Sequence, residues 1–167
     1  RIAQSLYEKG LISYHRTDSL NLSSISLAEA KKYILDNFGK DYWPGFSRAY
    51  KTKSKSAQEA HEAIRPTIVS SDPQNLRPDL DTTQLKLYTL VWQRFLACQM
   101  SEAIFDSTAI DVAAEKEKSK TYLFRATGQI LRFDGFLKVY PLKFEETNLP
   151  LMEKEDDLDL VKLIPAQ

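Results

Sequence analysis

The chain has 167 residues, of which 43% are hydrophobic and 11% aromatic, a composition that is typical of a globular protein and excludes intrinsic disorder. Its 23 basic and 23 acidic residues cancel, which excludes a surface that is positively charged throughout. The single cysteine, Cys98, excludes a disulfide framework and a zinc site built from cysteines, and no apolar run is long enough to span a membrane.

The first ten residues predict a helix. Ile2, Leu6 and Leu11 lie close to helical spacing, and Gly10 is a typical helix stop. Because the sequence opens on Arg1 and reads as helix at once, we expect it to begin inside an element of a larger protein.

Residues 11–23, LISYHRTDSLNLS, place a tyrosine two residues before an arginine, with several polar side chains behind them. A phenol is mostly protonated at neutral pH, so a tyrosine nucleophile needs a cationic partner. Arg16 can stabilise both a phenolate at Tyr14 and the extra charge on a pentavalent phosphorus. If this segment is extended, the two side chains share a face and His15 points away, without a chemical role. A surface tyrosine followed by a loop and a helix cap fits the same residues.

A second helix is expected between residues 26 and 39. Ser26 and Glu29 have the spacing of a capping box, and Gly39 ends the pattern. The apolar stripe of this helix consists of Leu27, Ala30, Ile34 and Phe38.

A basic loop follows, because residues 46–57, FSRAYKTKSKSA, contain no acid. Its cations can follow a nucleic-acid backbone while Tyr50 stacks on a base, although a solvated loop fits the same composition. The candidate DNA-binding residues here are Arg48, Lys51, Lys53 and Lys55.

Residues 57–64, AQEAHEAI, predict a short helix that Pro66 stops. His61 and Arg65 lie four residues apart and would share a face that holds a phosphate, with His61 as a proton carrier to a departing sugar hydroxyl. A surface helix in which His61 is flanked by Glu59 and Glu62 is the alternative.

The last predicted helix begins near Asp81, an N-cap with Gln84 at the third helical position. From residue 101 the pattern changes to the period of two that indicates strands, in STAIDVAA, TYLFRATG and, less regularly, LDLVKLI. We expect an α+β fold in which a helical subdomain, residues 1–100, precedes an antiparallel β-rich subdomain, residues 101–167. The stripe of the last helix, which must be buried, consists of Leu85, Tyr88, Trp92, Phe95 and Leu96.

The same residues fit three other hypotheses. Tyr14 and Arg16 fit a non-catalytic module that binds single-stranded DNA, and the whole chain fits a structural interaction module without DNA binding. A tyrosine recombinase also combines Tyr, Arg and His, but there the tyrosine normally comes last, whereas Tyr14 precedes His61 and Arg65. The sequence contains no zinc spacing, calcium loop or nucleotide fingerprint, so we expect no metal ligands in it.

Four blocks of the chain, in this order, resemble bacterial DNA topoisomerase I, a type IA topoisomerase: LYEKGLISYHRTDSLNLS, SAQEAHEAIRPT, LYTLVWQRFLACQMSEAIFDST and ILRFDGFLKVY. The resemblance implies an ATP-independent enzyme that relaxes negatively supercoiled DNA through a transient tyrosine link to a 5′ phosphate, strand passage and resealing. It implies that Tyr14 is the nucleophile, Arg16 its transition-state partner and His61 an aid to DNA binding and cleavage. Polar positions of the same motif match Glu8, Thr17 and Asp18.

The resemblance also implies partners outside this sequence. The family's Mg²⁺ is bound by a Toprim domain, and gate segments complete the enzyme; neither is present here. We therefore expect a fragment of the tyrosine-bearing region that is inactive by itself, and that binds single-stranded and underwound DNA within its parent chain. A monomer in the bacterial cytoplasm, associated with the nucleoid and not with a membrane, is expected.

Overall fold

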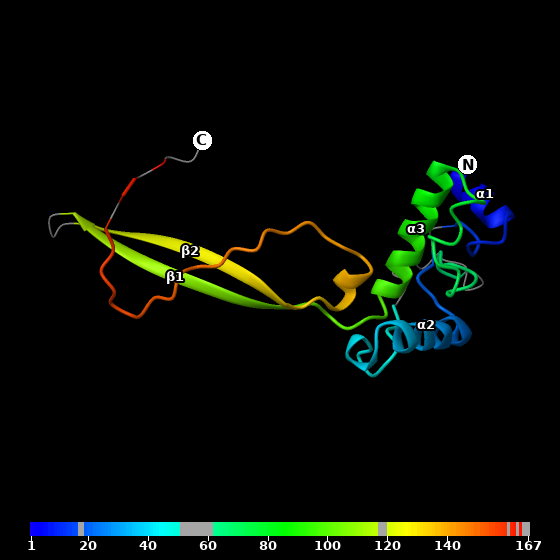
Figure 1. Ribbon diagram of the computed structural model, residues 1–167, viewed down its shortest axis with the longest axis horizontal. Helices are drawn as coiled ribbons and strands as arrows, with labels where there is room; N and C mark the ends of the chain where they lie inside the picture. The colour runs from blue at the N-terminus through cyan, green and yellow to red at the C-terminus, as the bar shows by residue number, and fades with distance from the viewer. Residues whose placement is uncertain (17–18, 51–61, 117–119, 160, 163, 165–167) are drawn as a thin grey trace. The chain divides into compact units, whose positions relative to one another are not determined.

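The computed structural model describes residues 1–16, 19–50, 62–116, 120–159, 161, 162 and 164. It has the α+β class that the sequence predicts, with helices first and an antiparallel strand pair second (Figure 1). In chain order the elements are α1 (Ile2–Glu8), α2 (Ser24–Asn37), the 3₁₀ turn η1 (Lys40–Tyr42), α3 (Thr82–Ala97), β1 (Ile104–Lys116), β2 (Lys120–Phe133) and the 3₁₀ turn η2 (Gly135–Lys138).

The chain divides into two compact units. The first comprises residues 1–104 and 131–144, and the second comprises residues 105–130 and 145–167. The assignment of residues 1–100 and 101–167 to two domains of a larger protein stays a prediction. Within the described part of the chain, no helix has the length and apolar character needed to cross a membrane.

Helix α3 begins where its sequence predicts. The Asp81 carboxylate accepts hydrogen bonds from the amides of Thr83 (2.8 Å) and Gln84 (2.9 Å), and the Gln84 side chain accepts from the Asp81 amide (3.2 Å). This reciprocal capping box satisfies amides that have no partner inside the helix. The predicted stripe is half-buried at Leu85 and buried at Tyr88, Trp92, Phe95 and Leu96.

The core of the first unit forms where α1 packs against α3 (Figure 1) and where side chains of α2 and the following loops join them. Two polar groups in this core have backbone partners: the Tyr88 hydroxyl donates to the Ser71 carbonyl (2.7 Å), and the Trp92 indole donates to the Val69 carbonyl (2.8 Å). Buried polar groups need such partners, so these bonds fix the loop around residue 70 on α3.

Helix α2 begins earlier than its sequence predicts. The N-cap is Ser23, whose hydroxyl accepts from the Ser26 amide (3.3 Å), so the capping box predicted at Ser26 and Glu29 is wrong. The Ser26 side chain is buried inside the first turn and donates to the Ser23 carbonyl (2.9 Å), whereas Glu29 stays exposed. The reason is tertiary: Glu62 accepts from the Ser23 amide (2.7 Å) and thereby sets the start of the helix.

The short helix predicted at residues 57–64 falls mostly outside the described residues. Its described part, residues 62–64, is not helical. Instead, the Ala63 amide donates to the Asn21 carbonyl (2.7 Å), a partner far away in the sequence. The prediction is therefore wrong for these three residues, because a long-range backbone bond replaces the helical one.

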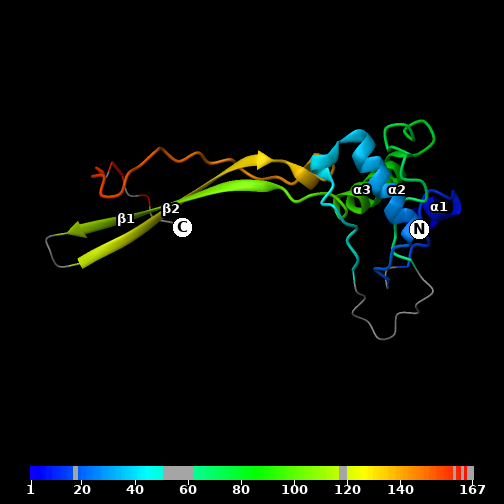
Figure 2. The same ribbon diagram turned by 90° about the horizontal axis from the view of Figure 1, so that it is seen from below.

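The second unit is built on the antiparallel pair β1–β2 (Figure 2), which confirms the first two predicted strands and extends them. Arg125 of β2 makes two hydrogen bonds to the Asp111 carboxylate of β1 (2.6 and 2.8 Å). The chain then returns along the hairpin, where Thr147 pairs with Gln129.

The strand predicted from LDLVKLI is wrong: its described residues, 158, 159, 161, 162 and 164, belong to no strand. Alternation makes a strand only where one face is buried, and here Val161 is 96% and Ile164 74% exposed.

Candidate functional site

The candidate site begins at a short backbone pairing between two distant segments. Ile12 forms an antiparallel bridge with Pro66, and the Ser13 amide donates to the Arg65 carbonyl (2.8 Å). The Ser13 hydroxyl donates to the Ala63 carbonyl (2.7 Å) and accepts from the Arg65 amide (2.9 Å). The residue directly after this pairing is Tyr14, so its backbone starts from a fixed point.

Tyr14 packs within an aromatic cluster that comprises Tyr7, Tyr14 and His15. The rings of Tyr7 and Tyr14 meet edge to face, with centroids 5.3 Å apart and planes at 70°. His15 packs against Tyr14 (5.0 Å) and Tyr7 (6.0 Å). Such pairs are typically worth about 0.5–1.5 kcal/mol beyond the area they bury. Tyr14 is nevertheless 45% exposed, which leaves part of its side chain accessible to a substrate.

His15 is half-buried, and its Nδ1 has no hydrogen-bond partner among the residues that the structure describes. The prediction that His15 points away from Tyr14 is wrong, because the two rings pack against each other instead of lying on opposite faces of an extended segment. The absence of a chemical role for His15, and the face shared by Tyr14 and Arg16, stay predictions.

The far end of the polar run is also anchored. Ser19 is buried and accepts from the Asn21 amide (3.1 Å), while the Asn21 carbonyl accepts from the Ala63 amide (2.7 Å). Two residues later, the Ser23 amide donates to Glu62 (2.7 Å). The stretch from Tyr14 to residue 20 therefore starts and ends against the same short segment, residues 62–65.

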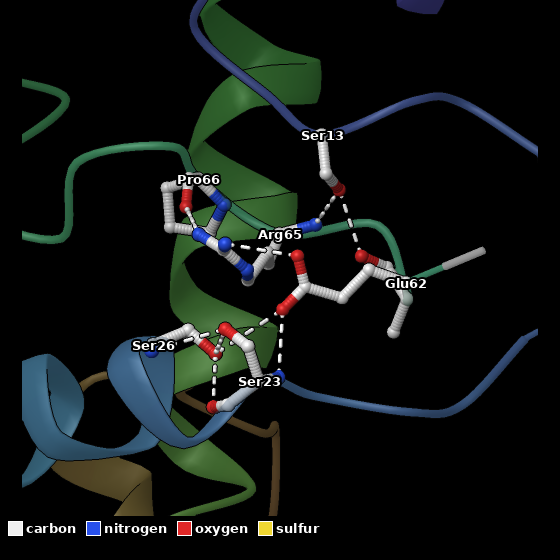
Figure 3. Close-up of polar contacts among 7 residues, drawn as sticks. Ser13, Ser23, Ser26, Glu62, Arg65 and Pro66 are labelled. Atoms are coloured by element: carbon white, nitrogen blue, oxygen red, sulfur yellow. Dashed lines mark hydrogen bonds and ion pairs between the residues drawn. The ribbon is translucent and has the colours of Figure 1, made fainter. Parts of the chain in front are cut away.

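An ion pair organises that segment (Figure 3). The Glu62 carboxylate accepts from the Arg65 guanidinium (2.9 Å), from the Ser23 amide and, more weakly, from the Ser26 hydroxyl (3.4 Å). Burial alone would raise the pKa of the Glu62 carboxyl, but the hydrogen bonds from Arg65 and Ser23 outweigh it and hold that pKa below its ordinary value. Glu62 is therefore ionised at neutral pH.

Arg65 lies inside this arrangement. Its side chain is 15% exposed, and its two terminal nitrogens donate to Glu62 and to the Pro66 carbonyl (2.9 Å). Its Nε is buried without a partner among the described residues. The phosphate-binding role expected for Arg65 stays a prediction.

The other predicted residues near Tyr14 are placed as follows. Arg16 is exposed. Glu8 ends α1, directly after Tyr7, and accepts from the Gln4 side chain (2.9 Å). Their roles stay predictions. Three further candidates, Thr17, Asp18 and His61, lie outside the described residues.

Of the basic loop, the structure describes residues 46–50, which include Arg48 and Tyr50. Arg48 donates to the Met100 carbonyl (2.9 Å) and pairs with Glu102 (3.3 Å), and the Tyr50 hydroxyl donates to the Cys98 carbonyl (3.1 Å). Both side chains thus fold onto the end of α3. Their DNA-binding and base-stacking roles stay predictions, and Lys51, Lys53 and Lys55 lie outside the described residues.

Among the described residues, no cluster of three or more His, Cys, Asp or Glu side chains is arranged to hold a metal ion. The ring contact of Tyr7 with Tyr14 and the network that joins Ser13 to Glu62 were not predicted from the sequence. Tyr7 left only a weak signal, as an aromatic residue on a short helix seven positions before Tyr14. Ser13 and Glu62 left none, because the Ser13 contacts span 50 and 52 residues and those of Glu62 with Ser23 and Ser26 span 39 and 36.

A family model described as DNA topoisomerase matches residues 1–166. DNA topoisomerase 1 from Helicobacter pylori is 44% identical over 170 residues, an alignment that covers 97% of this chain and 22% of that protein. DNA topoisomerase 1 from Salmonella typhimurium is 46% identical over 169 residues, an alignment that covers 99% of this chain and 19% of that protein. This chain thus spans about a fifth of the length of these curated relatives.

Among solved structures, the full-length topoisomerase I from Thermotoga maritima is similar, with a TM-score of 0.71 and 34% sequence identity. The match covers 92% of this chain and 25% of that one.

Proposed function

We propose that this chain, which belongs to the DNA topoisomerase family, is the part of a type IA enzyme that carries the nucleophilic tyrosine, Tyr14. The observation that carries the proposal is the setting of Tyr14. Its phenol ring is 45% exposed, held edge-on by Tyr7 and attached to a backbone that is paired up to Ser13. A nucleophile needs this combination of access and fixed position.

The proposed reaction exchanges one phosphodiester for another. A bond forms between the Tyr14 hydroxyl oxygen and a DNA phosphorus while the bond from phosphorus to the sugar 3′ oxygen breaks. The phenol loses its proton, and the departing 3′ oxygen gains one. Since one phosphodiester is made for each one broken, resealing is the same step in reverse and needs no ATP. Strand passage while the break is open relaxes negatively supercoiled DNA.

The remaining residues take supporting roles in this proposal. Arg16 stabilises the charge that develops on the phosphorane. His61 carries the proton to the departing sugar oxygen. The DNA strand is held by Glu8, Thr17, Asp18, Arg48, Lys51, Lys53 and Lys55, with the cations following its phosphates.

The proposal places the rest of the enzyme in a longer parent chain. The described residues form no cluster of His, Cys, Asp or Glu side chains that could hold a metal ion. We propose that Mg²⁺ is bound by a Toprim domain of that parent chain, and that gate domains of the same chain open the break. The substrate is single-stranded or underwound DNA, and the parent works as a monomer in the bacterial cytoplasm, at the nucleoid.

The test is covalent capture of DNA by the parent enzyme. A single-stranded oligonucleotide labelled at its 3′ end should become attached to the protein in denaturing gels, because the tyrosine keeps the 5′ phosphate of the downstream piece. Tyr14→Phe should abolish this adduct and leave oligonucleotide binding largely unchanged. Peptide mapping should find the label on Tyr14.

Tyr7→Phe is the matched control, since Tyr7 is also exposed (43%) and its ring touches that of Tyr14. This variant should still form the adduct. Adduct formation that survives Tyr14→Phe, or a label mapped to Tyr7, would refute the proposal. The 167-residue chain alone should form no adduct, and binding without any adduct in the complete parent would instead support a non-catalytic DNA-binding module.

A further inference from the structure

We infer that Glu62 and Arg65 are positioning residues for Tyr14, acting through Ser13, and that Arg65 is not a phosphate ligand. This inference rests on the proposed function, because it assigns a task within the cleavage reaction. It concerns the network in Figure 3, which joins the start of α2 to the residue that precedes Tyr14.

The stretch that contains Tyr14 is anchored at both ends by hydrogen bonds to the same segment. The Ser13 hydroxyl and amide bond to Ala63 and Arg65, whereas the Asn21 carbonyl bonds to Ala63. Residues 62–65 therefore hold both ends of this stretch. A displacement of residues 62–65 would displace both ends. It would also displace Tyr14, because Tyr14 is the next residue after Ser13.

Residues 62–65 are in turn held in place by the side chains of Glu62 and Arg65. The two Glu62 oxygens have separate tasks: one accepts from the Ser23 amide at the start of α2, and the other accepts from Arg65. Arg65 also donates to the Pro66 carbonyl (2.9 Å), which lies in the bridge to Ile12. One ion pair thus links α2, the bridge and the residue before Tyr14.

The Arg65 guanidinium is largely buried within this network. The Arg65 side chain is 15% exposed, both terminal nitrogens donate within the fold, and Nε is buried. A phosphate would have to compete for this guanidinium with the Glu62 carboxylate, a largely buried, ionised partner 2.9 Å away. One donor on each terminal nitrogen is used within the network, where it holds the Glu62 carboxylate and the Pro66 carbonyl in place.

A carboxylate is required at position 62 for a chemical reason. It offers two acceptor oxygens, and both are used, whereas an amide offers one acceptor and one donor. Glu62→Gln therefore sets an amide N–H against either the Ser23 amide or the Arg65 guanidinium, and one contact is lost. Its volume hardly changes, so the variant tests the contact and not the packing.

The experiment measures two quantities in the parent enzyme with a single-stranded oligonucleotide. One is the single-turnover cleavage rate at saturating oligonucleotide, and the other is the Kd with its salt dependence, determined in a Tyr14→Phe background. Glu62→Gln and Arg65→Gln should each slow cleavage by roughly 10- to 100-fold, as misplacement of a nucleophile does. The Kd and its salt slope should not change. The double variant should be no slower than the worse single one.

Asp36→Asn is the matched control, because Lys32 and Asp36 form an exposed ion pair on α2 that touches nothing in this network. It should leave the cleavage rate unchanged. Circular dichroism reports folding of each variant. If Arg65→Gln does not fold, Ser13→Ala takes its place, since it keeps both charges and removes the hydroxyl contacts to residues 63 and 65; slower cleavage with unchanged Kd is again expected.

Two results would overturn the inference. Arg65 would be a phosphate ligand if Arg65→Gln weakened binding and lowered the salt slope by about one, while Glu62→Gln tightened binding. Cleavage at the wild-type rate in folded Glu62→Gln would remove the positioning role. If the wild-type parent formed no adduct at Tyr14, the proposed function and this inference would both fail, which distinguishes that case from the other two.

Discussion

Tyr7 stands edge-on to Tyr14, with ring centroids 5.3 Å apart and planes at 70°. Tyr7 belongs to α1, whereas Tyr14 follows the bridge at Ile12, so the contact joins the first helix to the candidate nucleophile. An edge-to-face pair restricts the tilt of each ring, and this restriction is what an in-line attack requires.

Replacing the Tyr7 ring should therefore slow cleavage without removing it. Tyr7→Ala loses an aromatic contact worth about 0.5–1.5 kcal/mol, which corresponds to a cleavage rate lower by roughly 2- to 10-fold. Tyr7→Phe keeps the ring and should retain nearly the wild-type rate. Single-turnover cleavage of a labelled oligonucleotide by the parent enzyme measures the rates of both variants. Equal rates for Tyr7→Ala and Tyr7→Phe would show that the ring contact has no part in cleavage.

The buried hydroxyl of Tyr88 should make the fold sensitive to alkaline pH. Burial, and to a lesser degree Asp72 and Tyr33, raise the pKa of Tyr88 to about 12. Between the ordinary pKa of 10.0 and this value, the unfolded chain loses the proton while the folded chain keeps it. The free energy of unfolding must therefore fall as the pH rises through this range.

Tyr88→Phe removes both this linkage and the hydrogen bond to the Ser71 carbonyl. At pH 7 the variant should be less stable by about 1 kcal/mol. The gap in unfolding free energy between wild type and Tyr88→Phe should shrink between pH 10.0 and about 12, because only the wild type has a titrating hydroxyl at position 88. Urea unfolding of the chain, followed by tryptophan fluorescence, measures this. Tyr122→Phe, at a 53% exposed site, is the control, and a stability gap that stays constant with pH would contradict the assignment.

Gly135 should be the least replaceable glycine of the first unit. Its φ is +47°, and a Cβ there would lie 2.6 Å from the Ser101 carbonyl oxygen and also against the Glu102 carbonyl. Gly10 has a comparable φ of +71° but open space around it. Gly135→Ala should therefore destabilise the chain by clearly more than about 1 kcal/mol, and by more than Gly10→Ala, which has only the backbone strain. Equal urea midpoints for the two variants would contradict this.

The elements that local rules define were predictable. Asp81 and Gln84 meet within one helical turn, so the start of α3 follows from residues that are close in the sequence. The alternation of apolar and polar residues likewise predicted the two strands that pair as β1 and β2. The start of α2 was not predictable, because Ser23 and Ser26 are both good caps. The choice between them depends on Glu62, a residue 39 positions away from Ser23.

The same limit applies to the candidate site. The motif around Tyr14 was readable because tyrosine, arginine and polar residues are adjacent in the chain. Its support was not, since Ser13 meets Arg65 across 52 positions and Tyr7 meets Tyr14 through the fold of α1. Local spacing instead predicted a helix that would align His61 with Arg65, whereas residues 62–64 pair with distant backbone.

The Glu62 ion pair should make the stability of the chain sensitive to acid. Because Arg65 and Ser23 hold the pKa of Glu62 below its ordinary value of 4.5, the folded state favours the ionised carboxylate. The stabilisation is complete above 4.5 and is lost as the pH falls through the lowered pKa of the folded state. Glu62→Gln lacks this linkage. Its unfolding free energy should be lower than that of wild type at pH 6, and the two should converge as the pH approaches 3. Urea unfolding between these pH values tests the prediction, with Asp36→Asn as the exposed control. A gap between Glu62→Gln and wild type that is as wide at pH 3 as at pH 6 would mean that the carboxylate charge is not what stabilises the network.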